Sequence, residues 1–491
     1  MILVIDGHAY RYEIESLCNV FFPYEKITIT DIPVSSDERL VYTGYTQEQD
    51  VAKLSVFVQL DGKTAQKQLE FSLATPDFER QCGIALSRLL YDLLTELTAY
   101  HPQWGMLIGV RPIKLLRRLT EQVGAERAVE YLQNTLGVTP QKTAISVRTM
   151  AHEQPILAVS RPESFSLYIS IPFCPTRCAY CSFIAQSTEK TAKLIPLYTD
   201  LLCKELIHTA AVAKACNLRL ETIYMGGGTP TTLSAEQLVQ VIDTVYQHFD
   251  LSNCREFTIE AGRPDTITSE KLAAMRTRDI TRISINPQTL EPNVLDSLGR
   301  GHTVEQVFDS FALARAHGFT NINMDLIAGL AGDTPEGFAR TLTGVLDLSP
   351  ESITVHTLAL KRASSINQSG KTLFVNDGTA ASEMLAYADA QLTNGGYIPY
   401  YLYRQSRMVG NLENTGWAKP SYENFYNVYI MDETHTILAC GAGAVSKLKH
   451  PYQEDLTRIF NFKFPNEYIS RFSEMLARKE QVKAFYGQTL G

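Results

Sequence analysis

Hydrophobic and polar residues alternate along the first 73 residues of the chain, which is the pattern of half-buried strands. The β-rich runs are residues 2–5, 10–14, 41–45 and 54–60. Asp61-Gly62 follows the last run and is a hairpin signal, so we expect a small antiparallel sheet here. From Asp77 onward, apolar residues such as Leu86 and Leu90 recur every three or four positions, which predicts a helix. Further helices are expected over residues 113–119, 125–136 and 141–153.

Strand-like and helical segments alternate over the middle of the chain. Pro155 and Pro162 interrupt helical sequence and mark a junction before this part. The strand-like runs are residues 167–171, 222–225, 256–260, 282–286, 321–326 and 352–357, and amphipathic segments lie between them at 194–213, 235–249, 270–275, 304–316 and 337–348. A strand and a helix in repeated alternation predict a parallel sheet with helices outside, closed as a partial (β/α)6 barrel. Ligands of such folds bind at the carboxyl ends of the strands.

The chain from about residue 397 has a third pattern. It opens with a tyrosine-rich segment at 397–403, continues with strand-like runs at 427–431 and 436–440 and a glycine turn at 441–443, and ends in helical sequence. We therefore expect an α/β protein of three domains. They are an N-terminal α+β accessory domain (a β-meander, then helices) at 1–155, the partial barrel at 163–395 and a C-terminal α+β extension covering the barrel at 396–491.

Composition and charge fit a cytoplasmic enzyme. The 491 residues are 45% hydrophobic and 20% charged, as in ordinary globular proteins, and exceed what one core usually serves. The formal net charge of -8 argues against a protein that coats nucleic acid. The segment Met1–Asp6 lacks the cationic and long apolar regions of a signal peptide, and no apolar run is long enough to cross a bilayer.

Three cysteines lie close together after the first expected barrel strand, in Cys174-Pro-Thr-Arg-Cys178-Ala-Tyr-Cys181. Thiolates at these spacings hold three corners of a 4Fe-4S cluster and leave the fourth iron open to bind S-adenosylmethionine (SAM), whose reductive cleavage gives a 5′-deoxyadenosyl radical. The alternative is a zinc site, but zinc normally takes two pairs of ligands and no second pair is visible. The other cysteines are scattered singly and are expected to be buried small side chains: Cys18, Cys82, Cys203, Cys216, Cys254 and Cys440.

Glycines and polar residues end several of the expected barrel strands. Gly226-Gly-Gly-Thr-Pro230 ends the second strand and either forms only a turn or lets the backbone approach the amino group of the SAM methionine. Glu260, Gln288 and Asp325 follow later strands, where a barrel exposes its functional rim, although each alone is more often a cap or a loop contact. Arg300 lies after Gln288 and either reaches a carboxylate or is a solvated loop side chain.

Cationic residues are candidates for binding an anionic substrate, because guanidinium groups suit carboxylates. The candidates are Arg263, Lys361, Arg362, Arg404 and Arg407, each of which alone is more often a surface charge. The tyrosines of 397–403 suit either the wall of a pocket for a large planar ligand or a packed core. A helix face with Arg111, Lys114, Arg117 and Arg118 fits RNA binding, but more often a solvated or interdomain face.

These motifs together resemble the radical SAM coproporphyrinogen III oxidase family, the oxygen-independent kind, over residues 165 to 450. The shared motifs are Tyr168-Ile-Ser-Ile-Pro-Phe-Cys174, the cysteine triad, Gly226-Gly-Gly-Thr-Pro-Thr231, Ile259-Glu260, Arg282-Ile-Ser-Ile-Asn-Pro-Gln288 and Asn323-Met-Asp325-Leu-Ile-Ala-Gly329. The HemZ-like branch is also similar in Glu260-Ala-Gly-Arg-Pro-Asp265, Val355-His-Thr357, Lys361-Arg-Ala-Ser364, Tyr400-Tyr-Leu-Tyr-Arg-Gln405, Gly410-Asn-Leu-Glu-Asn414 and an added N-terminal domain. One departure is Phe183, where the oxidase branch carries a further cysteine and the heme-chaperone branch does not.

The resemblance implies the radical SAM partial barrel and the roles of individual residues. Cys174, Cys178 and Cys181 match the cluster ligands. Tyr168, Gly227, Glu260 and Ala359 match positions near the SAM molecule that is cleaved. The oxidase branch binds a second SAM molecule, and the matching positions here are Tyr180, Gly228, Thr229, Gln288, Arg300 and Asp325.

The activity that the resemblance implies is the oxidative decarboxylation of coproporphyrinogen III to protoporphyrinogen IX, with one or two SAM molecules bound. It also implies a tetrapyrrole substrate and an electron donor such as flavodoxin or ferredoxin, with no membrane partner. Three alternatives stay open: a heme carrier or chaperone that does not decarboxylate, another radical tetrapyrrole-modifying enzyme such as a methyltransferase or a heme-opening enzyme, and an RNA-modifying enzyme that uses the N-terminal basic face.

Overall fold

The computed structural model describes residues 1–491 except 24, 33–38, 182–185, 360–377, 406 and 490–491. The chain forms two compact units. Unit 1 consists of Met1–Val147 and Arg404–Leu412, and unit 2 of Arg148–Tyr403 and Glu413–Gly491. Within the described residues, no helix is both long and apolar enough to cross a membrane.

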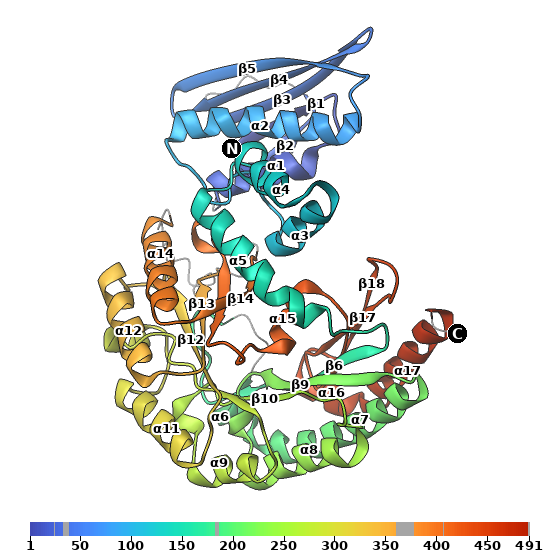
Figure 1. The fold of residues 1–491 in the computed structure, drawn as a ribbon, viewed down its shortest axis with the longest axis vertical. Helices are drawn as coiled ribbons and strands as arrows, with labels where there is room; N and C mark the ends of the chain where they lie inside the picture. Colours follow the sequence, from blue (N-terminus) through green and yellow to red (C-terminus); the bar gives the residue numbers. More distant parts are fainter. Residues whose placement is uncertain (24, 33–38, 182–185, 360–377, 406, 490–491) are drawn as a thin grey trace. The chain divides into compact units, whose positions relative to one another are not determined.

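Unit 1 contains a mixed five-stranded sheet of order β2-β1-β3-β4-β5 (Figure 1). Its strands are β1 (Ile2–Asp6), β2 (Thr28–Thr30), β3 (Leu40–Glu48), β4 (Val51–Leu60) and β5 (Lys63–Ser72). The predicted antiparallel arrangement holds for β3, β4 and β5 but is wrong for β1, which pairs in parallel with β2 and β3. The expected strand at 10–14 is instead the start of helix α1 (Arg11–Phe21), because Ile14, Leu17 and Cys18 bury one helical face.

The helices of unit 1 follow the predicted periodicity. Helix α2 (Phe78–Thr98) buries Leu86, Leu90 and Leu94 in a core shared with Leu3, Val56 and other strand residues. The remaining elements are α3 (Pro112–Val123), α4 (Ala125–Glu130), the π-helical turn η1 (Tyr131–Thr135) and α5 (Pro140–Leu157), within which the chain leaves unit 1. The expected interruption at Pro155 does not occur, since that residue lies in the last turn of α5, where little of the hydrogen-bond ladder remains to be lost.

Unit 2 is built on an 11-stranded sheet of order β14-β15-β13-β12-β11-β10-β9-β6-β16-β17-β18. Six consecutive parallel strands form its centre, as the alternating pattern predicted: β6 (Ser164–Ile171), β9 (Arg219–Gly227), β10 (Glu256–Glu260), β11 (Arg282–Ser284), β12 (Ile322–Ala328) and β13 (Ser352–Thr357). Their carboxyl ends therefore lie along one rim.

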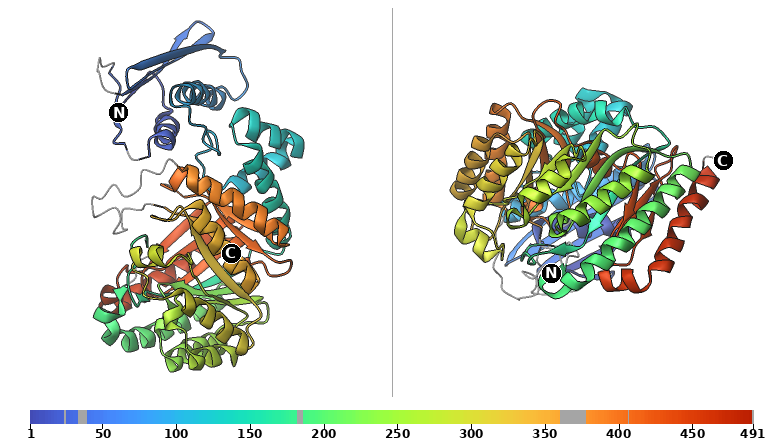
Figure 2. Two further views of the ribbon diagram at one scale, coloured as in Figure 1. Left: turned by 90° about the vertical axis from the view of Figure 1, so that its left-hand side faces the viewer. Right: turned by 90° about the horizontal axis from the view of Figure 1, so that it is seen from below.

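Helices follow these strands and cover the outer face of the curved sheet (Figures 1 and 2). They are α7 (Ile195–Ala215), α8 (Ala235–His248), α9 (Ser269–Arg276), α10 (Pro292–Ser297), α11 (Val304–Ala316), α12 (Pro335–Leu348) and α14 (Thr379–Asn394). Short elements in the connections are β7 (Phe173–Cys174), β8 (Gln186–Ser187), α6 (Thr188–Thr191) and the 3-10 turns η2 (Ala192–Leu194), η3 (Pro230–Thr232), η4 (Pro264–Thr266) and η5 (Val409–Asn411). Side-chain caps at Ser234, Thr303 and Thr334 fix where α8, α11 and α12 begin.

The C-terminal strands extend the same sheet at both ends. Strand β16 (Thr436–Cys440) pairs in parallel with β6 and leads to β17 (Val445–Lys449) and β18 (Leu456–Phe460), while β15 (Asn414–Ala418) and β14 (Ile398–Tyr403) follow β13. The predicted strand at 427–431 is wrong: Asn424 accepts a hydrogen bond from the Asn427 N–H and starts helix α15 (Phe425–Asp432). The chain ends in α16 (Pro465–Ser470) and α17 (Phe472–Thr489), which packs beside α7 (Figure 2).

Candidate functional site

The cysteine loop begins where β6 ends, at the carboxyl rim of the sheet. Strand β7 pairs with β8, so the two ends of the cysteine loop lie side by side. Cys178 is buried, and Cys174 and Cys181 are half-buried. Burial raises the pKa of the Cys174 thiol to about 11, the Thr229 hydroxyl opposes this shift, and the other two cysteines add to it. The three sulfurs therefore lie within electrostatic reach of one another.

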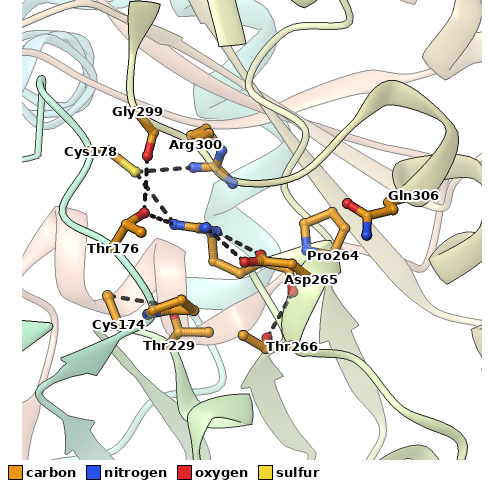
Figure 3. A network of polar contacts seen from close by, with 12 residues as sticks. Cys174, Thr176, Cys178, Thr229, Pro264, Asp265, Thr266, Gly299, Arg300 and Gln306 are labelled. Carbon is orange, nitrogen blue, oxygen red and sulfur yellow. Dashed lines mark hydrogen bonds and ion pairs between the residues drawn. The ribbon is translucent and has the colours of Figure 1, made fainter. Parts of the chain in front are cut away.

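The sulfur atoms receive donors from the surrounding chain (Figure 3). The Thr229 hydroxyl donates to Cys174 Sγ over 3.4 Å. Nη1 atoms of two arginines approach Cys178 Sγ, Arg300 at 3.8 Å and Arg263 at 4.0 Å. Two of the three sulfurs therefore have side-chain donors directed at them.

Arg263 and Arg300 are each held by several further contacts. Arg263 forms a two-bonded ion pair with Asp265, with distances of 2.9 and 2.8 Å, and donates to Thr176 Oγ1 over 3.0 Å. Arg300 donates to the Tyr180 hydroxyl over 2.8 Å and to the carbonyls of Gly262 and Asn286 over 3.0 and 2.7 Å. Both side chains are therefore fixed against the cysteine loop.

The glycine run at the end of β9 is required by close contacts. A Cβ on Gly226 would lie 2.8 Å from Glu260 Cδ, and one on Gly228 would lie 2.5 Å from the Phe173 carbonyl oxygen. Gly227 has a φ of +105°, and its Cβ position lies 3.3 Å from the Tyr168 hydroxyl. The run is therefore more than a turn, since it lets β9 approach both β10 and the start of the cysteine loop.

Glu260 is a buried carboxyl group at the end of β10. Burial raises its pKa to about 7, the Tyr224 hydroxyl opposes this by donating a 2.5 Å hydrogen bond, and nearby Asp325 adds to the increase. The Tyr224 ring stacks on Tyr426, with centroids 4.6 Å apart, and lies 6.3 Å from the Tyr168 ring. An apolar wall of tyrosines therefore flanks a carboxyl group that changes charge near neutral pH.

Gln288 and Asp325 meet through the backbone of neighbouring strands. Gln288 has a φ of +69°, and its N–H donates to the Asp325 carbonyl over 2.9 Å. Its buried Oε1 has no hydrogen-bond partner in the described part of the chain. Asp325 Oδ1 accepts from Asn323 Nδ2 over 2.7 Å, and Oδ2 lies 3.7 Å from His356 Nε2. A polar atom of Gln288 is thus left available for a ligand.

The predicted site residues fall into three groups. The half-exposed Ala359 follows β13. Most of the predicted residues lie together along the rim of unit 2: Tyr168, Cys174, Cys178, Tyr180, Cys181, Gly227, Gly228, Thr229, Glu260, Arg263, Gln288, Arg300 and Asp325. Arg404 and Arg407 belong to unit 1: Arg404 donates to carbonyls there and Arg407 is exposed. Lys361, Arg362 and Phe183 lie outside the described residues.

Sequence reasoning missed several residues of this site. Tyr224 donates to Glu260, the Asn286 carbonyl accepts from Arg300, and His356 lies near Asp325. Asn286 and His356 lie within the shared motifs 282–288 and 355–357, but the sequence indicates no role for them, because only the fold brings them to these partners. His302 is buried, and within the described ranges neither of its ring nitrogens has a partner. Burial, with the charges of Arg300 and Arg263, lowers the pKa of His302 to about 3, so this side chain is neutral. The only signal in the sequence is that it follows Arg300 by two residues.

The cysteine loop fits the ligand set of an iron–sulfur cluster. One loop supplies three thiols, and hydroxyl and guanidinium donors are directed at two of the sulfurs. Among the described residues, no three His, Cys, Asp or Glu side chains already surround a single point for a metal ion. The fit therefore rests on the donor set and on the hydrogen bonds to sulfur.

Comparisons with known proteins found a matching family model, similar relatives and a similar solved structure. The model of the radical SAM superfamily matches residues 168–343. The chain is 39% identical to oxygen-independent coproporphyrinogen-III oxidase-like protein HemZ of Bacillus subtilis over 82% of this chain and 81% of that protein. It is 32% identical to heme chaperone HemW of the same organism over 53% and 69%. Coproporphyrinogen III oxidase (HemN) from Escherichia coli has a similar solved structure, with a TM-score of 0.52, 26% identity, and coverage of 66% of this chain and 73% of that one.

Proposed function

Because the chain belongs to the radical SAM family of oxygen-independent coproporphyrinogen III oxidase-like proteins, we propose that it decarboxylates coproporphyrinogen III to protoporphyrinogen IX without oxygen. The family implies a 4Fe-4S cluster and SAM. The observation that carries the proposal is the joint placement of the cysteine loop, the glycine run and Glu260 at one rim of the sheet, in a chain similar to HemN.

Each rim residue has a proposed part in binding. Cys174, Cys178 and Cys181 hold three of the irons. Tyr168, Gly227, Glu260 and Ala359 bind the SAM molecule that is cleaved. Tyr180, Gly228, Thr229, Gln288, Arg300 and Asp325 bind the methionine end of SAM or a second SAM molecule. The orphaned Gln288 Oε1 supports this placement, because a buried oxygen without a donor is costly unless a ligand supplies one.

The reaction requires hydrogen abstraction from a saturated carbon. The cluster and SAM, when bound, supply a 5′-deoxyadenosyl radical for this purpose. The β-carbon of a propionate loses one hydrogen atom, its carboxylate then leaves as CO2, and one electron passes to an acceptor, so that a vinyl group remains. Two propionates react in this way, and a flavodoxin or ferredoxin supplies the electrons that SAM cleavage consumes.

The substrate carboxylates need cations that are not already engaged. Arg263 is committed to Asp265, Thr176 and the cysteine loop, and Arg404 to backbone carbonyls of unit 1. Among the candidates from the sequence, Lys361 and Arg362, which lie outside the described residues, are the cations that we propose for binding the tetrapyrrole. They follow β13 in the chain, and that strand belongs to the barrel sheet, which supports this choice.

A second candidate function is that of a heme chaperone, which the similarity to HemW favours. Such a protein would keep the cluster and bind heme without decarboxylating a substrate. Phe183 supports it too, since the chaperone branch also lacks a cysteine at that position.

One experiment separates these functions. The cluster is reconstituted anaerobically, reductant, SAM and coproporphyrinogen III are added, and 5′-deoxyadenosine is measured together with the tetrapyrrole mass. Loss of two carboxyl groups in step with deoxyadenosine is the expected result. Deoxyadenosine with an unchanged tetrapyrrole, and a stable complex with heme, would favour the chaperone; a mass change other than loss of CO2 would indicate another tetrapyrrole modification.

The variant Arg300→Ala tests the binding half of the proposal. Its guanidinium bridges the cysteine loop to the carbonyls after β10 and β11, so its loss weakens SAM binding about tenfold or more while the iron content stays at the wild-type level. Affinities for SAM and tetrapyrrole equal to those of the wild type would remove Arg300 from the site.

A further inference from the structure

Two fixed positive charges converge on Cys178. Arg263 Nη1 and Arg300 Nη1 lie 4.0 and 3.8 Å from its sulfur, and the two arginines are only 3% and 6% exposed. An arginine does not lose its proton in proteins, so both charges persist at any working pH. Because they are buried, solvent and salt screen them weakly.

The two arginines differ in their partners. Arg300 donates to neutral oxygens, those of Tyr180, Gly262 and Asn286. Arg263 instead carries a carboxylate partner, since its Nε and Nη2 form the two-bonded pair with Asp265. The pair turns the remaining Nη1 toward Cys178 and Thr176, and it offsets part of the charge that the sulfur experiences.

The same contacts connect three separate segments of the rim. Thr176 Oγ1 accepts from Arg263 and donates to the Gly299 carbonyl over 2.9 Å, and the Ala179 N–H donates to the Leu298 carbonyl over 3.0 Å. Figure 3 shows Thr176, Cys178, Asp265 and Arg300 in this network. The position of Arg263 is thus determined by Asp265 and by the loop that carries the cysteines.

We propose that Arg263 and Asp265 set the reduction potential of the cluster held by the cysteine loop, with Arg263 raising it and Asp265 limiting the increase. They are positioning residues that act through Cys178. Reduction adds one negative charge to a cluster, so a nearby positive charge stabilises the reduced state and a negative charge destabilises it. The proposal rests on the proposed function only in requiring that this loop holds a cluster.

The consequence is control over which electron donor can serve the protein. A higher potential eases reduction of the cluster by a weak donor and lowers the driving force for the next transfer to SAM. Asp265 keeps that balance because its carboxylate is bound to the same guanidinium whose charge it offsets.

The test is a potentiometric titration of the reconstituted cluster without SAM or tetrapyrrole. Electron paramagnetic resonance measures the reduced cluster at each potential. Arg263→Gln is expected to lower the ratio of reduced to oxidised cluster about tenfold at a fixed potential, which is a midpoint lower by about 59 mV for one electron. Asp265→Asn moves the midpoint the opposite way. Arg263→Lys keeps the charge and shifts it less than Arg263→Gln does.

Arg177→Gln is the matched control. It removes one positive charge from the same loop, next to Cys178 in sequence, but Arg177 is exposed, so solvent screens it and the midpoint changes little. Iron and acid-labile sulfide are measured in every variant to show that the cluster is intact.

Opposite shifts for Arg263→Gln and Asp265→Asn support the proposal, whereas unchanged midpoints or shifts of the same sign overturn it. If Arg263→Gln does not retain a cluster, the sign of the Asp265→Asn shift still decides. The two proposals fail separately. If the variants show these shifts but the wild-type protein releases no CO2, only the proposed function is contradicted. Active variants with wild-type midpoints contradict only this inference.

Discussion

Two buried arginines, one in each compact unit, show how differently the same side chain is used. Arg263 of unit 2 and Arg404 of unit 1 are each 3% exposed, and the sequence made both candidates for binding a substrate carboxylate. Arg263 lies against a carboxylate, a hydroxyl and a thiol. Arg404 donates to the carbonyls of Leu107, Gly109 and Asn411 and stacks on the Trp104 ring at 5.3 Å.

The partners decide what each charge does. Backbone carbonyls are neutral acceptors that need a donor when buried, so Arg404 holds the shape of unit 1 around the segment 404–412. A cluster held by cysteine thiolates would change its charge on reduction, so a guanidinium beside one of those sulfurs would influence that step. Burial of an arginine is therefore no evidence for a substrate site until its partners are known.

The largest effect is expected from removing the group that Arg263 faces. Cys178→Ala leaves two thiols in the loop, and we expect iron and acid-labile sulfide to fall to background after reconstitution while the far-ultraviolet circular dichroism spectrum is unchanged. Arg404→Ala, in contrast, should retain the full iron content. A Cys178→Ala protein with wild-type iron content would show that this cysteine is not a ligand.

Arg404→Ala should instead reduce stability. Three carbonyl oxygens lose their donor and a buried ring loses its cationic partner, so the free energy of unfolding falls by about 3 kcal/mol. Denaturant unfolding of the full chain measures this change. Arg407→Ala is the matched control, because Arg407 is exposed three residues further on and its loss should change stability by no more than about 0.5 kcal/mol. Equal stability of the two variants would contradict the structural role of Arg404.

The affinity for SAM at the rim of unit 2 is expected to depend on pH. If Glu260 binds SAM as a carboxylate, as proposed, its carboxyl group, whose pKa burial raises to about 7, must first lose its proton. SAM affinity should therefore rise about tenfold between pH 6 and pH 8, as the ionised fraction rises.

Equilibrium dialysis with the reconstituted protein measures this affinity. Asp325 and His356 also face Glu260, so Glu260→Gln is compared at both pH values and should bind SAM weakly, without the increase. An increase that persists in Glu260→Gln would assign the titration to another group.

The smallest effect concerns a neutral donor to sulfur. Thr229→Val removes the hydroxyl that donates to Cys174 but keeps the side-chain shape. Hydrogen bonds to cluster sulfurs raise the reduction potential, so the midpoint should fall, but by less than in Arg263→Gln, because no full charge is lost. The same potentiometric titration measures it, and a rise in the midpoint would show that the hydroxyl does not act through Cys174.

The sequence pattern predicted the barrel strands because short runs rich in β-branched and apolar residues, such as those of β12 and β13, alternate with amphipathic helical segments. It failed at 10–14 and 427–431, where strand-like composition lies in short helices. At 427–431 the Asn424 cap favours the helix. At 10–14 the helix is favoured because it buries Ile14, Leu17 and Cys18 in the core of unit 1. Short apolar runs fit either structure, and tertiary contacts decide between them.

The sequence by itself determined the alternation of strands and helices, the cysteine spacing and the glycine run, because these depend on residues close together in the chain. Only the tertiary structure decided the roles of the charged residues. Asp265 and Thr176 became the partners of Arg263 because β10 and the loop after β6 reach the same rim, and Arg404 turned to carbonyls because its segment joins unit 1. A charge acts over a few ångströms of space, and the fold alone determines which residues lie within that distance.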